Sequence, residues 1–108
     1  MPSTLKRIYT GQPGTTDTLL YTVPGATKVA ITDIHLANTD ATPRGITIGL
    51  NAGGALAEAS YFIPDLEVPA NGVADWTGHQ VLEAGETIRA LQDNATGVTV
   101  HISGVEVS

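Results

Sequence analysis

The stretch KVAITDIHLAN, residues 28–38, predicts a β-strand whose apolar residues change sides halfway along. Alternate side chains of a strand point to opposite faces, so Val29 and Ile31 share one face. Ile34 and Leu36 fall on the other face. Since a small protein with one core needs only one buried face per strand, the second apolar face requires an explanation.

The stretch VTVHISGVEV, residues 98–107, repeats this pattern near the end of the chain. Its apolar residues up to Ile102 share one face, and Val105 and Val107 then occupy the other. Gly104 is a natural site for a β-bulge, which inserts one residue and restores the original face. The alternative is that neighbouring subunits cover the second face, as edge-rich β proteins often require.

The surplus of apolar side chains favours the second explanation, so the sequence predicts a homo-oligomer. Adjacent pairs such as Leu19-Leu20 and Tyr61-Phe62 add to this surplus. The lone tryptophan is typical of a core or interface anchor, because it buries a large area. The expected subunit-contact residues are Ile34, Leu36, Val105, Val107 and Trp76.

Short apolar runs separated by turn residues recur along the whole chain, and none keeps helical spacing for long. This pattern predicts a single all-β domain over residues 1–108, an antiparallel β-sandwich or jelly-roll-like fold of about eight strands. Segment 51–60 is predicted to be a long loop. The expected strands are Thr4–Tyr9, Thr18–Thr22, Lys28–Asn38, Gly45–Leu50, Ser60–Val68, Gly72–Thr77, Thr87–Gln92 and Val98–Val107.

Alternation also predicts which side chains form the core. In GITIGL, residues 45–50, the apolar residues fall on one face while threonine and glycine take the other. The residues expected to point inward are Ile46, Ile48, Leu50, Ile88, Val98, Val100 and Ile102.

Composition excludes several classes of protein. The net charge is −6 and the five basic residues are scattered, so binding to nucleic acid through its phosphates is not expected. The 108 residues include no cysteine, which rules out disulfides and thiolate chemistry. No apolar run is long enough for a membrane helix, and we expect no membrane partner.

Catalytic and metal-binding patterns are weak. Asp33 and His35 are two residues apart on a strand and could share a divalent ion, but a structural site needs about four converging ligands. The serines lack a nucleophile-elbow context, and no phosphate-binding loop is present. The sequence therefore predicts a protein that is not an enzyme and has no cofactor, with sugar binding by Trp76 and the tyrosines as an open alternative.

Four segments together resemble a known class of module. They are the strand-rich stretch at residues 19–50, VPANGVADW at 68–76, VLEAGETIRA at 81–90 and VTVHISGVEVS at 98–108. They resemble the small β-sandwich modules of tailed-bacteriophage virions, which occur as capsid decoration proteins and as modules of minor tail or fibre proteins.

The resemblance implies a structural virion protein, commonly a homotrimer, made in the host bacterial cytoplasm. A short chain without shaft or coiled-coil heptads is closer to a capsid decoration protein, whose partner would be the major capsid protein. The alternative is a small tail-associated or fibre module that adsorbs to host glycans and contacts tail proteins.

Overall fold

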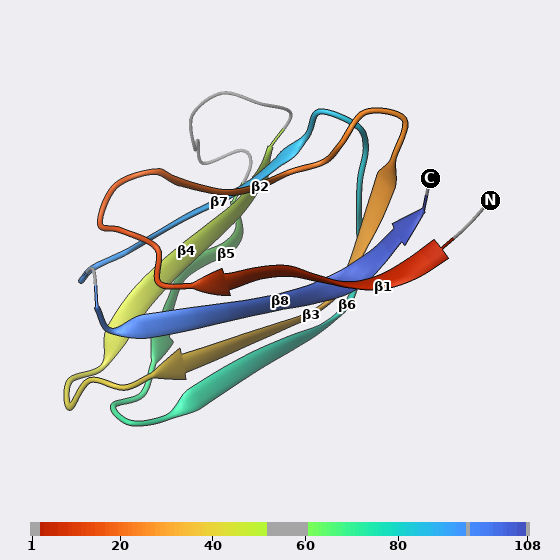
Figure 1. Ribbon diagram of the computed structural model, residues 1–108. Helices are drawn as coiled ribbons and strands as arrows, with labels where there is room; N and C mark the ends of the chain where they lie inside the picture. Colours follow the sequence, from red (N-terminus) through yellow and green to blue (C-terminus); the bar gives the residue numbers. More distant parts are fainter. Residues whose placement is uncertain (1–2, 52–60, 95, 108) are drawn as a thin grey trace.

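A computed structural model describes residues 3–51, 61–94 and 96–107 as a sandwich of two four-stranded antiparallel sheets (Figure 1). The first sheet has the order β1-β8-β3-β6 and the second has the order β2-β7-β4-β5. This confirms the predicted all-β fold of eight strands. The strands are β1 (Ser3–Gly11), β2 (Thr18–Thr22), β3 (Lys28–Asn38), β4 (Arg44–Asn51), β5 (Tyr61–Val68), β6 (Val73–Leu82), β7 (Thr87–Gln92) and β8 (Val98–Val107).

The strand limits agree with the predicted ones to within two residues, except at the end of β6. The predicted strand ends at Thr77, whereas β6 continues to Leu82. Gly78, which suggests a strand end in the sequence, lies inside β6 with a φ of 156°. The predicted loop at 51–60 lies outside the described residues, apart from Asn51 at the end of β4. Within the described ranges, no helix is long and apolar enough to cross a membrane.

A β-bulge explains the change of face in β3. The pairing of β3 with β8 shifts between Ile31 and Asp33, so Thr32 is an additional residue with no paired residue on β8. A bulge of this kind returns the following side chains to the original face. Val29, Ile31, Ile34 and Leu36 are consequently all buried in the core between the sheets.

The outcome in β8 is the opposite, because the bulge at Gly104, the first of the two explanations, does not form. Residues 98–107 of β8 pair with β3 without an extra residue on β8. Gly104 instead allows β8 to approach β3 closely, because a Cβ there would lie 2.4 Å from the carbonyl oxygen of Ala30. Val105 and Val107 therefore remain on the outer face of the first sheet.

Each of the four edge strands contains at least one residue more than its inner neighbour over the paired region. The additional residues interrupt the ladder at Ile8 in β1, at Leu20 in β2, at Phe62 and Pro64-Asp65 in β5, and at Gly78-His79 in β6. Bulges of this kind increase the local twist of a strand and end regular pairing. The edges of both sheets are thus irregular, whereas β8 and β7 at the centre are not.

The core lies between the two sheets and contains the predicted inward-facing residues. Ile46, Ile48, Ile88, Val98, Val100 and Ile102 are buried, and Leu50 is partly buried against them. Burial of each such aliphatic side chain contributes about 1.5–3 kcal/mol to stability. The sequence prediction of the core is therefore confirmed.

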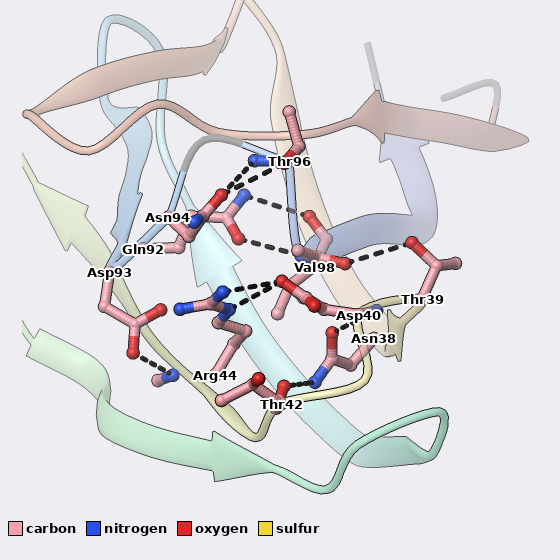
Figure 2. A network of polar contacts seen from close by, with 12 residues as sticks. Asn38, Thr39, Asp40, Thr42, Arg44, Gln92, Asp93, Asn94, Thr96 and Val98 are labelled. Atoms are coloured by element: carbon pink, nitrogen blue, oxygen red, sulfur yellow. Dashed lines mark hydrogen bonds and ion pairs between the residues drawn. The ribbon is translucent and has the colours of Figure 1, made fainter.

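Two buried amide side chains hold the loops at one end of the sandwich (Figure 2). The Gln92 amide donates to the carbonyl oxygens of Pro13 and Val98, at 2.7 and 3.0 Å, and accepts from the Val98 N–H at 2.8 Å. Asn38 donates to the carbonyl oxygen of Thr42 at 2.9 Å and accepts from the Asp40 N–H at 2.9 Å. These bonds satisfy loop groups that would otherwise be buried without partners.

Candidate functional site

The surface of the sandwich has its exposed apolar side chains on the four edge strands. Within the described residues, none of the large exposed hydrophobic side chains lies on an inner strand. Exposed edge strands are the usual places where β proteins meet partners. The residues are Leu5 on β1, Leu19 on β2, Tyr61 and Leu66 on β5, and Val73 and Val81 on β6.

Cross-strand pairing joins some of these side chains into an apolar row across the first sheet. Leu5 pairs with Val105, Val105 pairs with Ala30, and Ala30 pairs with Val81. All four side chains point outward, away from the core. Leu5 is 86% exposed and Val81 is 62% exposed at the two ends of the row. We call Leu5, Val105, Ala30 and Val81 the apolar row.

An open hollow of about 340 Å³ lies beside the apolar row. At its floor are Ser103 and Gly104, two small residues of β8 that face bulges in both neighbouring strands. The hollow can accept a side chain of modest size from a partner. Its lining residues are Leu5, Lys6, Arg7, Thr32, Ser103 and Gly104.

A polar row crosses the same face further along the strands. His101 pairs with His35, and His35 pairs with Asp75. The two imidazole rings have centroids 5.8 Å apart at 49°, and His35 Nδ1 hydrogen-bonds to Asp75 Oδ1. Asp33 shares this outer face with His35, as the sequence predicts. Among residues 3–51, 61–94 and 96–107, no three histidine or carboxylate side chains are placed to hold a metal ion.

The structure corrects two of the five expected subunit-contact residues. Ile34 is 0% exposed and Leu36 is 1% exposed, because the bulge at Thr32 turns both into the core of the chain itself. They have no surface to offer a partner. Val105 and Val107 are partly exposed on the outer face.

Trp76, the fifth expected subunit-contact residue, is neither fully buried nor fully exposed. Its indole is partly buried beside the core and packs edge-on against the Phe62 ring, with centroids 4.7 Å apart at 80°. A Cβ at Gly78 would lie 3.0 Å from the same indole. The ring therefore links β5 to β6 across the sandwich.

A charged cluster that sequence inspection missed joins the two sheets. Lys6 Nζ lies 2.8 Å from Glu106 Oε2, and the Tyr21 hydroxyl donates to the same oxygen at 3.3 Å. The Lys6 hydrogen bond lowers the pKa of the Glu106 carboxyl, and that bond in turn raises the pKa of Lys6. Burial raises the pKa of Tyr21. The cluster is composed of satisfied partners and is a structural element.

The loop network at the other end is also structural. Asp40 accepts hydrogen bonds from Arg44 Nε at 2.9 Å and Nη2 at 2.7 Å, and these bonds lower the pKa of the Asp40 carboxyl. Asp93 accepts from the N–H of Gly45 at 3.0 Å. Figure 2 shows these carboxylates directed at loop groups of the same chain. The outer face of the first sheet is therefore the better candidate for a functional surface.

The fold and this surface define a β-sandwich with an outward apolar row. Comparison with models of known protein families finds no match, and comparison with curated protein sequences finds none either. Among solved structures, the chain is similar to a pentameric capsid protein isolated from metagenomic phage sequences. In one crystal structure of that protein the identity is 22% and the TM-score 0.36, over 92% of this chain and 60% of that chain.

A second crystal structure of a pentameric capsid protein from metagenomic phage sequences gives the same identity and TM-score, over 61% of its chain. An exo-β-1,3-galactanase from Phanerochaete chrysosporium, solved with β-1,3-galactotriose, has 17% identity and a TM-score of 0.37 over 26% of its chain. This chain thus spans about 60% of the capsid-protein chains. Likenesses at this level assign neither a family nor an activity.

Proposed function

We propose that this chain is a non-enzymatic structural protein of a bacteriophage virion, an oligomeric capsid decoration protein that stabilises the head. The observation that carries the proposal is the apolar row, an outward strip of side chains that reaches from one edge of the first sheet to the other. The sequence resemblance to small virion β-sandwiches supplies the biological setting.

The polar groups of the described surface support a structural role over a catalytic one. The Lys6–Glu106 and Asp40–Arg44 pairs are bonded to one another and to the fold. His35 and Asp75 pair with each other on an open strand face. A contact surface is the use of this face that the geometry favours.

A decoration protein stabilises a shell by bridging neighbouring capsomers. Each copy adds a modest interface, and the effect is multiplied over many symmetry-related positions. Charged residues are only 15% of this chain, so its contacts are expected to depend mainly on apolar and backbone groups. Such contacts persist in moderate salt, unlike contacts made through counterion release.

Particles assembled without this protein provide the test. We expect them to form with normal geometry and to rupture at a lower temperature, and we expect the purified protein to restore the rupture temperature when added back. Addition at low and at moderate salt should restore it equally. If the depleted particles keep their full thermal stability but fail to adsorb to host cells, the chain is a tail-associated adsorption module instead.

A further inference from the structure

On the outer face of the first sheet, β3 carries opposite charges on the two sides of the apolar row. On β3, Lys28 lies one outward position before Ala30, and Asp33 lies one outward position after it, once the bulged Thr32 is discounted. On β8, Val107 and Ser103 are in the same two positions around Val105. On β3 a cation thus lies on one side of the row and an anion on the other. Hollows lie on both sides: one of about 190 Å³ beside Lys28 and Val107, and the one beside Ser103, which Arg7 also lines.

We propose that two copies of this chain pack these faces together about a twofold axis that crosses the strands at the apolar row. The inference rests on the proposed homo-oligomer and names its contact. Rotation about this axis places each strand antiparallel over its own copy, so Val105 faces Val105 and Ala30 faces Ala30. The contact is isologous, because the same patch is used by both copies.

The same rotation brings complementary groups together on both sides of the axis. Lys28 of each copy faces Asp33 of the other, and Val107 of each copy faces the hollow at Ser103. Lys28 is available for this contact, since its ammonium lies 3.4 Å from Glu83 in a pair whose side chains are 66% and 65% exposed. The β3 strand is therefore complementary to its own copy in charge.

A twofold axis parallel to the strands fits less well. It would place β8 over β3 of the second copy, with Val107 over Lys28 and Ser103 over Asp33. Lys28 would then lie over Val107 with no carboxylate opposite it, whereas Asp33 would lie over the hollow that Lys6 and Arg7 line. Only the axis that crosses the strands pairs Lys28 with Asp33.

The overlap that this axis allows corresponds to a weak pair. Four strands at about 4.8 Å spacing are about 19 Å wide. Val105 is two residues from the end of β8, so rotation about the row superposes about five residues of each strand, or about 17 Å. This overlap covers roughly 300 Å² of sheet on each copy, or about 600 Å² in total, in the range of weak, transient contacts. An isologous contact forms pairs, so it favours a dimer or a multiple of dimers over the trimer that the resemblance implies.

Single-cysteine variants test the position of the axis, because the native chain has no cysteine. Val105→Cys should give a covalent dimer in high yield with a short bis-maleimide crosslinker, since the two thiols face each other across sheets about 10 Å apart. Ser103→Cys, on the same strand and face, is the matched control and should crosslink poorly. Equal crosslinking of the two variants indicates the axis parallel to the strands, and no crosslinking of Val105→Cys overturns the contact.

Charge reversal tests the Lys28–Asp33 contact in solution. We use a Glu83→Gln background, because Lys28 also pairs with Glu83 in its own chain. Lys28→Glu and Asp33→Lys should each raise the dimer dissociation constant at least about tenfold, since twofold symmetry disrupts two pairs at once. The double variant should restore it, as measured by analytical ultracentrifugation. If the two single variants and the double variant have the same dissociation constant, the proposed pairing is wrong.

The outcomes are separable from those of the particle experiment. A chain that forms this dimer but does not stabilise particles refutes the decoration role alone. A chain that stabilises particles but sediments as a monomer or a trimer refutes this contact alone.

Discussion

Single residues decide on which face the apolar side chains of this protein lie. Thr32 adds one residue to β3, and the four aliphatic side chains around it consequently share the core. Gly104 adds none to β8, so Val105 and Val107 stay outside. The two stretches have the same sequence pattern and opposite outcomes, because in the pairing of β3 with β8 the extra residue is on β3.

Gly104→Ala is expected to destabilise the chain by about 2–3 kcal/mol, the cost of overpacking at a site that cannot relax. The new Cβ would lie 2.4 Å from the Ala30 carbonyl oxygen, a backbone atom held between two paired strands. Gly25→Ala is the control, since a Cβ there meets no atom within 4 Å. Chemical denaturation measures both, and equal stability of the two variants would contradict the close approach.

At the level of the strands, the parts of the fold that the sequence predicts are those that depend on local pattern. Period-two alternation finds all eight strands and the buried face of β4, because these depend on local pattern. It fails at β6, where Gly78 suggests a strand end but is accommodated by an irregularity opposite Thr32. The bulge depends on pairing with strands distant in sequence, so the local pattern cannot reveal it.

The candidate site was predicted only in part for the same reason. Val105 and Val107 are on the outer face as the sequence suggests, whereas Ile34 and Leu36 are in the core. Leu5 and Ala30 join Val105 only through cross-strand register, and Leu5 and Val105 are 100 positions apart in the sequence. The surplus of apolar residues is visible in the sequence. Strand register determines where on the surface these residues lie together.

The cluster of Lys6 on β1, Glu106 on β8 and Tyr21 on β2 predicts that the stability of the fold depends on pH. The pKa of Glu106 is lower in the folded chain than the ordinary 4.5, so its contribution is present above pH 4.5 and is lost as the pH falls through the folded value. The pKa of Lys6 is raised above 10.5, so its contribution is present below that pH and is lost as the pH rises through the folded value.

Glu106→Gln should therefore show a smaller loss of stability than the native chain when both are acidified below pH 4.5. The measurement is the free energy of unfolding by denaturant at a series of pH values. Glu67→Gln removes an exposed carboxylate of β5 and should retain the native acid dependence. An unchanged acid dependence in Glu106→Gln would show that the Lys6 hydrogen bond contributes nothing.

At the scale of the whole molecule, association and folding should be linked. If copies meet at the apolar row, the melting temperature should rise with protein concentration, because the assembly binds only the folded chain. Val105→Glu places a charge at the centre of the row and should fold as a monomer with a concentration-independent melting temperature.

Thr99→Glu is the matched control, at an outward position of β8 remote from the apolar row. It should keep the concentration dependence of the native chain. Calorimetry over a hundredfold range of concentration distinguishes the cases. A native melting temperature that does not change over this range would mean that the row is not a contact between copies.

The bulges in the edge strands also affect how readily this chain can aggregate. A sheet edge with a long, regular row of unpaired backbone groups can recruit further chains without limit and form fibrils. Here additional residues interrupt β1, β2, β5 and β6, so an incoming strand cannot keep a continuous ladder along any of them. The interruptions therefore oppose amyloid-like polymerisation through the sheet edges, while the outer faces of the sheets stay free for contacts that close.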